Sequence, residues 1–570
     1  MQSFLLDVGR DGGTGIVGID TGAVLRLSSD AGAFGNPLYA GEAGLAGFGR
    51  AGGCGVLRVS SGGQLLIENT DGVSDTPILR FGRDGGSVGT ARISGAGSSV
   101  DVIQHGAQGD NYFGGAILNI GEGGQGIVTV TDGAQINVLG DQALLQIARG
   151  RNGAADSVES QLDITNGGVV NGFFFDIGRG YGSDGRVLVD GVGSTLNASD
   201  MFGAFPDFVG EAGFLRLGRN AGSHGRLDVT NGGTVNVTND PSGSYDTPQI
   251  VLARDNGARG VLVVDGAGSS LTVAQTGSSG EFFYEGATIE IGEGGQGIAT
   301  VSNGATISVL GDAAKIRVAS GRYDDNTAEQ SLLSILGGAQ VTVDAQGYGV
   351  VTPLAGGYDT MFHGALVSIG GQQGTNGRLL VDGTGSMLTL TSTGATAFGS
   401  GLIIGDGGTG VLDITAGGQV RNLGIGGTTT VGLEPGASGT VNIDGGDGSD
   451  LLLGGNGTDA LDGGFDRLEG GAGIDTLDGG FGTDILLGGA DADTFLFTSD
   501  ADGADRVLDF EDGIDRIQFT GITDVAGFGD LVIAAQGTDT LVTAGSVSVL
   551  LEGVDLALIE ADNFLFGTVT

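Results

Sequence analysis

Cysteine, proline, lysine and tryptophan are scarce or missing in this sequence of 570 residues. Cys54 is the only cysteine, so the chain can form neither an internal disulfide nor a thiolate metal cluster. The 7 prolines, and the lack of a G-X-Y period among 121 glycines, exclude collagen and Pro-rich disorder. No apolar run approaches the ~20 residues of a membrane-spanning helix. The motif H-E-x-x-H, which zinc proteases use, is also absent.

Basic residues are few relative to acidic ones. Lysine and arginine together number 24, against 68 aspartates and glutamates, which gives a net charge of −44. This charge argues against binding to nucleic acids and to anionic lipid surfaces. Residues 441–570 carry 26 acidic and 3 basic side chains, so a net charge of −23 lies in less than a quarter of the chain. The chain is therefore expected to contain two regions of different composition, with a boundary near residue 440.

Glycine is abundant, and its pattern predicts the fold class. Interior glycines cost a helix about 1 kcal/mol each relative to alanine, whereas a hydrophobic content of 39% allows a sizeable core. Residues 1–440 repeat an apolar residue, a glycine-rich turn and alternating strands. Instances begin at Gly9, Gly49, Gly82, Gly121, Gly178, Gly218, Gly292, Gly370 and Gly405. We predict an all-β fold, in which residues 1–440 form a long parallel β-solenoid with its valines, isoleucines and leucines facing inward.

A longer duplication agrees with this solenoid. Residues 82–170 align without a gap with residues 253–341, with 41 identities in 89 positions. A solenoid tolerates such duplication because each coil contacts only its neighbours. At roughly 20 residues per coil and ~4.8 Å of rise, residues 1–440 would give about 20 coils and a rod on the order of 100 Å long. The repeats resemble those of β-helical adhesins and autotransporter passengers, which implies shape more than activity.

Several residues between the repeats could carry a function. Aromatic residues cluster at 112–113, 173–175, 202–208, 282–284 and 358–362. They could belong to loops that shield the solenoid, or they could contact a glycan or a neighbouring subunit, and the sequence leaves both alternatives open. The histidines His105, His224 and His363 lack a paired metal-ligand spacing and are expected in solvent. Cys54 has no base at a meaningful spacing, so a buried or tolerated thiol is expected. The run Gly121–Gly126 lacks the following helix of a nucleotide-binding loop.

From residue 445 the sequence period changes to nine. Five full units begin at Gly445, Gly454, Gly470, Gly479 and Gly488, and a shortened unit covers residues 463–469. The sixth place of each full unit is an aspartate: Asp450, Asp459, Asp475, Asp484 and Asp493. These units resemble the RTX nonapeptide G-G-x-G-x-D-x-U-x, which implies a parallel β-roll with two units per turn and Ca²⁺ between stacked loops. Besides the five aspartates, the resemblance assigns loop positions to the calcium sites: Gly446, Asp447, Gly448, Gly455, Asn456, Gly457, Gly471, Gly473, Gly480, Gly482 and Gly489.

The shortened unit affects the expected row of ions. Loops of a β-roll stack on units two apart, so units 454–462, 470–478 and 488–496 avoid the shortened one. We therefore expect the best calcium sites around Asp459, Asp475 and Asp493. Asp450 and Asp484 would face a defective partner.

The last part of the chain resembles the segment that closes β-rolls in proteins exported by type I secretion. This resemblance rests on residues 492–497, 505–510 and 513–517, and it implies an uncleaved signal within residues 541–570. Residues 1–10 lack the basic and apolar regions of a Sec signal peptide, which agrees with this route. The expected organisation is a β-solenoid in residues 1–440, an RTX β-roll in residues 441–497 and a C-terminal β segment in residues 498–570.

These features favour a non-enzymatic, calcium-dependent structural or adhesive protein, such as a surface-layer, matrix or adhesin protein. It would be secreted to the medium or cell surface of a Gram-negative bacterium, with the type I machinery, further copies of itself and a cell-surface glycan as possible partners. A repeat starts at Leu5 without a polar cap before it, so association of rods is expected. The alternative is a polysaccharide-active β-helix enzyme, a lyase or epimerase with an RTX module. Such an enzyme needs a general acid and base in one groove, for which one lysine and three isolated histidines are a poor basis.

Calcium is expected to order the C-terminal region, because the carboxylates of the nonapeptides repel one another until a cation lies between them. Circular dichroism of a 441–570 fragment, first with EGTA and then with millimolar calcium, tests this. A spectrum that calcium leaves unchanged would contradict the prediction.

Overall fold

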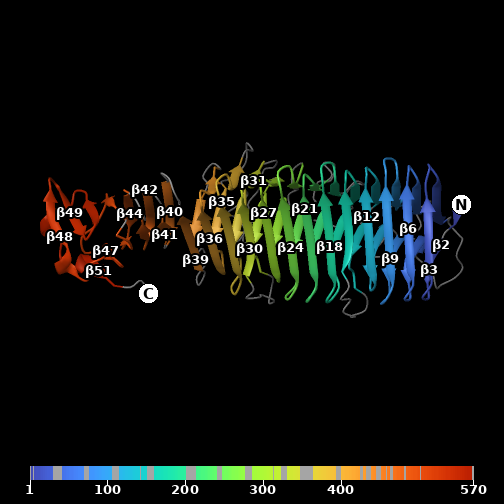
Figure 1. The fold of residues 1–570 in the computed structure, drawn as a ribbon, viewed down its shortest axis with the longest axis horizontal. Helices are drawn as coiled ribbons and strands as arrows, with labels where there is room; N and C mark the ends of the chain where they lie inside the picture. Colours follow the sequence, from blue (N-terminus) through green and yellow to red (C-terminus); the bar gives the residue numbers. More distant parts are fainter. Residues whose placement is uncertain are drawn as a thin grey trace, which may run out of the picture.

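The protein is a long, narrow rod of strands, with the N- and C-terminal segments at opposite ends (Figure 1). A computed structural model describes residues 2–3, 5–29, 42–69, 76–105, 115–140, 143–150, 159–199, 213–239, 247–276, 286–311, 313–321, 330–346, 364–392, 400–423, 428–431, 438–444, 451–457, 459–462, 467–479, 483–500 and 502–567. Within these residues the helices are the short 3-10 turns η1 (Phe528–Asp530), η2 (Leu556–Leu558) and η3 (Ala561–Asn563). The predicted all-β fold is confirmed. No helix among these residues is long and apolar enough to cross a membrane.

Each coil of the solenoid contributes one strand to each of three parallel sheets. Sheet 1 contains β1 (Gln2–Ser3), β4 (Val24–Ser29), β7 (Gln64–Asn69), β10 (Ser99–Ile103), β13 (Gln135–Leu139), β16 (Val169–Gly172), β19 (Thr195–Ser199), β22 (Thr234–Thr238), β25 (Ser270–Ala274), β28 (Thr306–Gly311), β31 (Gln340–Ala345), β34 (Met387–Ser392) and β37 (Gln419–Asn422). Sheet 2 contains β2 (Leu5–Arg10), β5 (Glu42–Arg50), β8 (Thr76–Arg83), β11 (Ile117–Glu122), β14 (Leu144–Ile147), β17 (Phe174–Ile177), β20 (Phe214–Leu217), β23 (Gln249–Leu252), β26 (Thr288–Ile291), β29 (Lys315–Val318), β32 (Leu366–Ile369), β35 (Gly401–Ile404) and β38 (Thr428–Val431). The solenoid part of sheet 3 contains β3 (Thr14–Ile19), β6 (Cys54–Ser60), β9 (Val88–Ser94), β12 (Gln125–Thr131), β15 (Ser160–Thr165), β18 (Asp184–Asp190), β21 (His224–Thr230), β24 (Arg259–Asp265), β27 (Gln296–Ser302), β30 (Gln330–Leu336), β33 (Asn376–Asp382), β36 (Thr409–Thr415) and β39 (Ser438–Asp444).

Neighbouring coils pair in parallel, but their lengths differ. Ile117 pairs with Leu144, 27 positions later, whereas Lys315 pairs with Leu366, 51 positions later. The expectation of roughly 20 residues per coil and about 20 coils is therefore wrong. A coil here uses three strands and connections of variable length, so sheets 1 and 2 contain 13 strands each. At about 4.8 Å per coil, the solenoid is on the order of 60 Å long.

Valine, isoleucine and leucine side chains from all three sheets fill the interior of the solenoid as one continuous apolar core. In sheets 1 and 3, buried and half-buried residues alternate along each strand, as in β18 and β19. Sheet 2 differs, because residues on both of its faces are buried, as in all four positions of β20 and β26. Its outer face therefore holds buried polar side chains, including Gln146, Asp176 and Glu290.

The repeated glycine of the sequence lies at the corner between sheets 2 and 3. Gly82, Gly178 and Gly218 have φ angles of 64°, 70° and 72°, in the left-handed region. A Cβ atom on Gly178 would lie 2.0 Å from the carbonyl oxygen of His224 in the next coil. Glycine is thus required both for the turn and for the close approach of successive coils.

Sheet 3 continues without a break from the solenoid into the C-terminal β-roll. β39 pairs in parallel with β41 (Asp459–Asp462), and the sheet goes on through β43 (Thr476–Asp478), β45 (Thr494–Phe497), β47 (Arg516–Phe519) and β51 (Phe564–Phe566). The other side of the roll, sheet 4, contains β40 (Leu451–Gly457), β42 (Arg467–Gly473), β44 (Ile485–Ala490), β46 (Ala504–Val507), β50 (Val547–Leu551), β49 (Asp539–Ala544) and β48 (Val532–Gln536). The expected boundary at residue 440 falls inside β39. A fragment that starts at residue 441 cuts this strand, so one that retains β36 and β39 is the appropriate companion for the calcium titration.

The structure locates several of the residues that the sequence analysis singled out. The duplicated segments form matching strands, since β9 and β24, like β12 and β27, lie 171 positions apart. Phe174 and Phe175 lie in β17, so the expectation of an inserted loop is wrong for them, because Phe175 fills the core. The aromatic clusters at 112–113, 202–208, 282–284 and 358–362, and His363, lie outside the described residues.

The remaining isolated side chains are on or near the surface. Cys54 is exposed and reduced, not buried. His224 is exposed as expected. His105 is half-exposed but not isolated, because its Nε2 atom lies 3.0 Å from Oε2 of Glu68. The strand β12 begins at Gln125, where a nucleotide-binding loop would lead into a helix, which agrees with the exclusion of such a loop.

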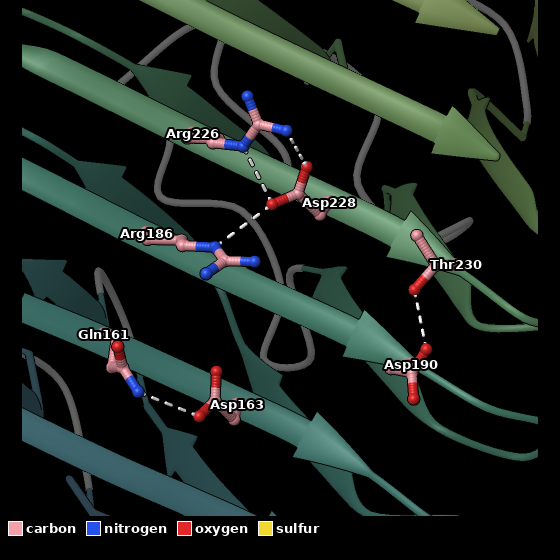
Figure 2. A network of polar contacts seen from close by, with 7 residues as sticks. All are labelled: Gln161, Asp163, Arg186, Asp190, Arg226, Asp228 and Thr230. Carbon is pink, nitrogen blue, oxygen red and sulfur yellow. Dashed lines mark hydrogen bonds and ion pairs between the residues drawn. The ribbon is translucent and has the colours of Figure 1, made fainter.

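Ion pairs and hydrogen bonds on the outer face of sheet 3 connect successive coils (Figure 2). Arg226 donates two hydrogen bonds to Asp228, at 2.9 and 2.6 Å, and Arg186 of the preceding coil donates a third at 3.2 Å. Thr230 donates to Asp190 at 2.7 Å in the same pair of coils. These contacts fix the register of the coils at the surface, as the apolar core does inside.

Replacing Gly89 with alanine should destabilise the solenoid by about 1–3 kcal/mol, because the added Cβ would overpack a tight junction. It would lie 2.2 Å from the backbone nitrogen of Gly82 and 2.3 Å from the carbonyl oxygen of Phe48. The control is Gly18→Ala in β3, where a Cβ would meet nothing within 4 Å. Thermal unfolding measures both, and equal melting temperatures for the two variants would contradict the prediction.

Candidate metal centre

The nonapeptide units stack as the spacing predicts. Ala460 pairs with Thr476, which pairs with Thr494, so units 454–462, 470–478 and 488–496 lie on consecutive turns. The apolar eighth residues Leu477, Leu486 and Phe495 are fully buried and form part of a second core. The shortened unit keeps its place in the stack, because β42 pairs with both β40 and β44. Its effect on the ions stays a prediction, since residues 463–466 lie outside the described residues.

The sixth residues of the units form columns of buried carboxylates, one on each side of the roll. Asp475, Asp484 and Asp493 are 0–1% exposed. The backbone N–H of Asp475 donates to Oδ1 of Asp493 at 3.0 Å, and that of Asp493 donates to Oδ1 of Asp515 at 3.0 Å. On the other side, the N–H of Asp484 donates to Oδ1 of Asp505 at 2.8 Å. Each carboxylate therefore holds the turn of the preceding coil with one oxygen.

The second carboxylate oxygen lies against the first glycine of the same unit. A Cβ atom on Gly479 would lie 2.4 Å from Oδ2 of Asp484, and one on Gly488 would lie 2.4 Å from Oδ2 of Asp493. This explains why the first place of a unit has to be glycine. Oδ2 of Asp493 is buried and accepts no hydrogen bond. Such an oxygen inside a glycine loop suits a hard cation that takes its other ligands from backbone carbonyls.

Burial makes these carboxylates weak acids in the absence of a cation. The pKa of Asp493 is raised to about 6, chiefly by burial and also by the carboxylates of Asp515, Asp475 and Asp509, while the hydrogen bond from the N–H of Asp475 lowers it. Burial likewise raises the pKa of Asp505 to about 8, together with Asp484 and Asp502. A divalent cation between the loops would replace the protons that these groups otherwise retain.

The described residues include part of the predicted set. The backbone of Gly455 pairs with Gly471, which pairs with Gly489, so these three loop glycines form one column. Asn456 and Gly457 of β40, Gly473 of β42 and Asp459 of β41 also lie in paired strands. The other predicted residues lie outside the described residues: Asp450, Gly446, Asp447, Gly448, Gly480 and Gly482. The assignment of all these residues to calcium stays a prediction.

Sequence reasoning missed four aspartates beyond residue 497. Asp505 and Asp515 continue the two columns, and Asp509 accepts hydrogen bonds from the N–H groups of Gly488 and Gly489 at 3.0 and 2.8 Å. Asp502 is buried and has one oxygen, Oδ1, without a hydrogen bond. The signal that could have found two of them is the spacing D-x-apolar, which persists at 505–507 and 515–517 after the glycine loops end.

The donor set favours calcium over a softer metal. In the part of the chain that the structure describes, no three histidine, cysteine, aspartate or glutamate side chains converge on one point. One carboxylate per loop, completed by backbone carbonyl oxygens, does not require such a cluster. All-oxygen ligation with six to eight positions is what Ca²⁺ prefers. The buried carboxylates therefore fit the calcium that the nonapeptides imply.

Changing Asp475 to alanine should weaken calcium binding roughly tenfold or more, because it removes a buried charged ligand. The matched variant is Asp450→Ala, at the end of the row beside the shortened unit, where the loss should be smaller. Isothermal titration calorimetry on the full chain compares the two. Equal losses would contradict the proposed row of ions.

Calcium affinity should rise between about pH 5.5 and pH 8.5. With a raised pKa in the fold, Asp493 and Asp505 keep protons at a pH where the unfolded chain, with a pKa of about 3.9, is ionised. The calcium-free roll is therefore favoured at low pH, and it loses this contribution as the pH passes about 6 and then about 8. Calcium needs the ionised carboxylates, so its binding should release protons in the same range. Titrations in buffers of different ionisation enthalpy measure this release, and an affinity independent of pH would contradict it.

Comparison with known proteins identifies this region. Residues 436–466 and 462–495 match the family of RTX calcium-binding nonapeptide repeats. Two solved structures of subunits of the mannuronan C5-epimerase from Azotobacter vinelandii are similar: the AlgE6R3 subunit is 37% identical, over 21% of this chain and 78% of that chain, with a TM-score of 0.19. The AlgE6R2 subunit is 32% identical, over 22% of this chain and 91% of that chain, with a TM-score of 0.19. A TibC-catalysed hyper-glycosylated TibA fragment is 14% identical, over 74% of this chain and 100% of that chain, with a TM-score of 0.21. No curated protein matches the chain.

The stacked glycine loops, the buried aspartates and the family match all concern the same residues, and RTX nonapeptides bind calcium. The chain contains a parallel β-solenoid that is followed by RTX calcium-binding nonapeptide repeats.

Proposed function

We propose that this protein is a secreted structural or adhesive rod whose C-terminal roll folds when it meets calcium outside the cell. The observation that carries the proposal is the continuity of sheet 3, in which β39 of the solenoid pairs directly with β41 of the roll. A roll ordered by calcium presents the backbone of β41, with which β39 in the last coil of the solenoid can pair. Calcium would thus control the folding of the whole rod, because each coil folds on its neighbour.

The distribution of polar groups along the solenoid supports a structural role over the alternative, a lyase or epimerase. Its arginines and carboxylates pair across successive coils, as Arg186 does with Asp228 and Arg378 with Asp413. A general acid and base gathered in one groove would be required for polysaccharide cleavage or epimerisation. Calcium binding and the rod are common to both functions, so only an activity assay on acidic polysaccharides separates them.

Export through a type I machinery, association of rods and contact with a cell-surface glycan complete the proposal. Rods of net charge −44 repel one another, and calcium would relieve that repulsion. Light scattering of calcium-loaded protein tests association. A stable species of 56.4 kDa at tens of micromolar would contradict the association of rods and would be compatible only with an adhesive monomer.

Deleting residues 541–570 should trap the protein inside a Gram-negative host that carries a type I exporter, whereas deleting residues 1–3 should not. The deletion also removes β50 and most of β49, so it damages the fold as well as the proposed signal. The control is Val507→Asp, which places a charge at a fully buried position outside residues 541–570. Type I substrates pass through the exporter unfolded, so this variant should still be exported. Secretion of the truncated chain would refute the route.

A further inference from the structure

A column of arginines runs along the corner between sheets 2 and 3. In the described residues, the position after the corner glycine or alanine is an arginine in seven of the first eight coils: Arg10, Arg50, Arg83, Arg149, Arg179, Arg219 and Arg254. The exception is Glu122. Register pairs Arg10 with Arg50 and Arg50 with Arg83. Backbone hydrogen bonds from Arg179 to Ala148 and from Arg219 to Gly178 continue the column. Seven of only 24 basic residues thus lie in one line on an acidic protein.

The middle of the column is held by a buried carboxylate. Arg149, Arg179 and Arg219 lie on three successive coils, with 40%, 24% and 28% of their side chains exposed. Asp176, which is 0% exposed, has its Oδ2 atom 3.6 Å from Nε of Arg179 and 3.7 Å from Nη1 of Arg219. Nη1 of Arg149 lies 3.7 Å from Oε1 of Glu122. The buried carboxylates therefore position the three guanidinium groups from the protein side, and the groups are partly exposed to solvent on the other side.

The N–H groups of these three guanidinium groups remain available as hydrogen-bond donors. Among the described residues, Arg149, Arg179 and Arg219 contact carboxylates only at ion-pair distance, and neither oxygen of Asp176 accepts a hydrogen bond. The arginines on sheet 3 of the same coils behave differently, since Arg186 and Arg226 both donate to Asp228 (Figure 2). Among the described residues, Arg149, Arg179 and Arg219 thus present planar sets of donors that approach carboxylates only at ion-pair distance.

The side chains that lie under the three arginines form a rigid, polar layer. The guanidinium of Arg216 is buried, 3.8 Å from Asp176, and lies over the rings of Phe174 and Phe214, which stack 4.8 Å apart. Gln146 precedes Asp176 in the strand register, is 1% exposed and has both amide atoms without a hydrogen bond. A buried amide without partners beside a row of free donors points to a ligand or its water shell.

Positive charge is in excess here. Arg149, Arg179, Arg216 and Arg219 are opposed by Asp176 and by Glu122, which Arg80 also contacts at 3.2 Å. Burial lowers the pKa of Arg179, and the charges of Arg219 and Arg149 lower it further, with Asp176 opposing them. The repulsion among neighbouring guanidinium groups would be relieved by an anion.

We infer that Arg149, Arg179 and Arg219 bind a linear acidic polysaccharide through carboxylates on successive sugars. Coils are about 4.8 Å apart, close to the length of one sugar in an extended chain. Arginine forks match carboxylates in bidentate geometry. Tyr181, which is 59% exposed in the turn after Arg179, adds a ring face for a sugar. This inference rests on the proposed adhesive role and names the chemistry of its ligand.

Other polyanions fit the surface less well. Double-stranded DNA carries one negative charge per about 1.7 Å, a higher density than one carboxylate per sugar, so it would be repelled more strongly by a chain of net charge −44. The acidic roll of a second copy is a further polyanion, and its association with these arginines is one outcome of the test below.

The test is binding of an oligogalacturonate to the full chain, by isothermal titration calorimetry at fixed millimolar calcium, with neutral dextran and dextran sulfate as comparison ligands. The double variant Arg179→Gln/Arg219→Gln should bind the oligogalacturonate about a hundredfold more weakly, or about tenfold per arginine. The matched control, Arg186→Gln/Arg226→Gln, removes the same charge from the same two coils and leaves one carboxylate behind, and it should bind within about twofold of wild type. Arg179→Lys/Arg219→Lys keeps the pairing with Asp176 but loses the planar forks, so it should fold and bind with intermediate strength.

Each outcome decides the inference. It is overturned if the wild type binds neither acidic ligand, if dextran or dextran sulfate binds as well as the oligogalacturonate, or if the two glutamine variants lose equally. It is also overturned if the wild type dimerises while Arg179→Gln/Arg219→Gln stays monomeric, since a second copy then occupies the surface. Failure of secretion or of calcium-driven folding would refute the proposed function and leave the binding result unaffected.

Discussion

Parallel hydrogen bonding between the backbones of successive coils is the constraint on which the rest of this structure depends. In sheet 3 it runs from β3 near the N-terminus to β51 near the C-terminus, through both the solenoid and the roll. An added coil in such a ladder satisfies its backbone groups only on the edge of its neighbour. The corner glycines serve this ladder, because a side chain at Gly178 would collide with the backbone of the next coil. Variable connections are accommodated because they lie outside the strands that pair.

The roll is held by the same parallel backbone hydrogen bonds, but its turns contain charged aspartate side chains. Burying Asp475, Asp484 and Asp493 without a cation is unfavourable, and the pKa of Asp493 is raised accordingly, first by burial and then by the neighbouring carboxylates. The Oδ1 atoms of Asp493 and Asp515 accept hydrogen bonds from backbone N–H groups of the preceding coil, so carboxylates that shape the turn also supply oxygens suited to a cation. In the proposed function, folding of the roll and calcium binding are one process. The loop at Gly488 and Gly489 is held differently, because the N–H groups of both glycines donate to the carboxylate of Asp509.

Along the solenoid, arginines have two roles that their spacing alone does not separate. On sheet 3, Arg186 and Arg226 direct their donors into Asp228 and connect coils. At the corner, Arg179 and Arg219 stand at ion-pair distance from the buried Asp176 and keep their donors. The difference arises because sheet 2 is buried on both faces, so its carboxylates lie below the guanidinium groups instead of beside them. A surface of positive charge can thus persist on a strongly acidic rod.

The sequence by itself determined the repeat, the inward alternation of sheets 1 and 3, and the nonapeptide roll with its aspartates in the sixth place. These are local patterns, since period two, period nine and glycine at positive φ are properties of neighbouring residues. It did not determine the length of a coil, because many strands of sheet 2, such as β20 and β26, have only four residues and are buried on both faces, so they lack an exposed polar face that would alternate with the core. It placed Phe174 and Phe175 in a loop for the same reason. Asp505 and Asp515 join the carboxylate columns, and Asp176 lies beside Arg216 and Arg219 of the next coil, only because the winding brings together residues tens of positions apart. Which coil lies on which was decided by the tertiary structure, because strand register depends on the cooperative fit of whole coils.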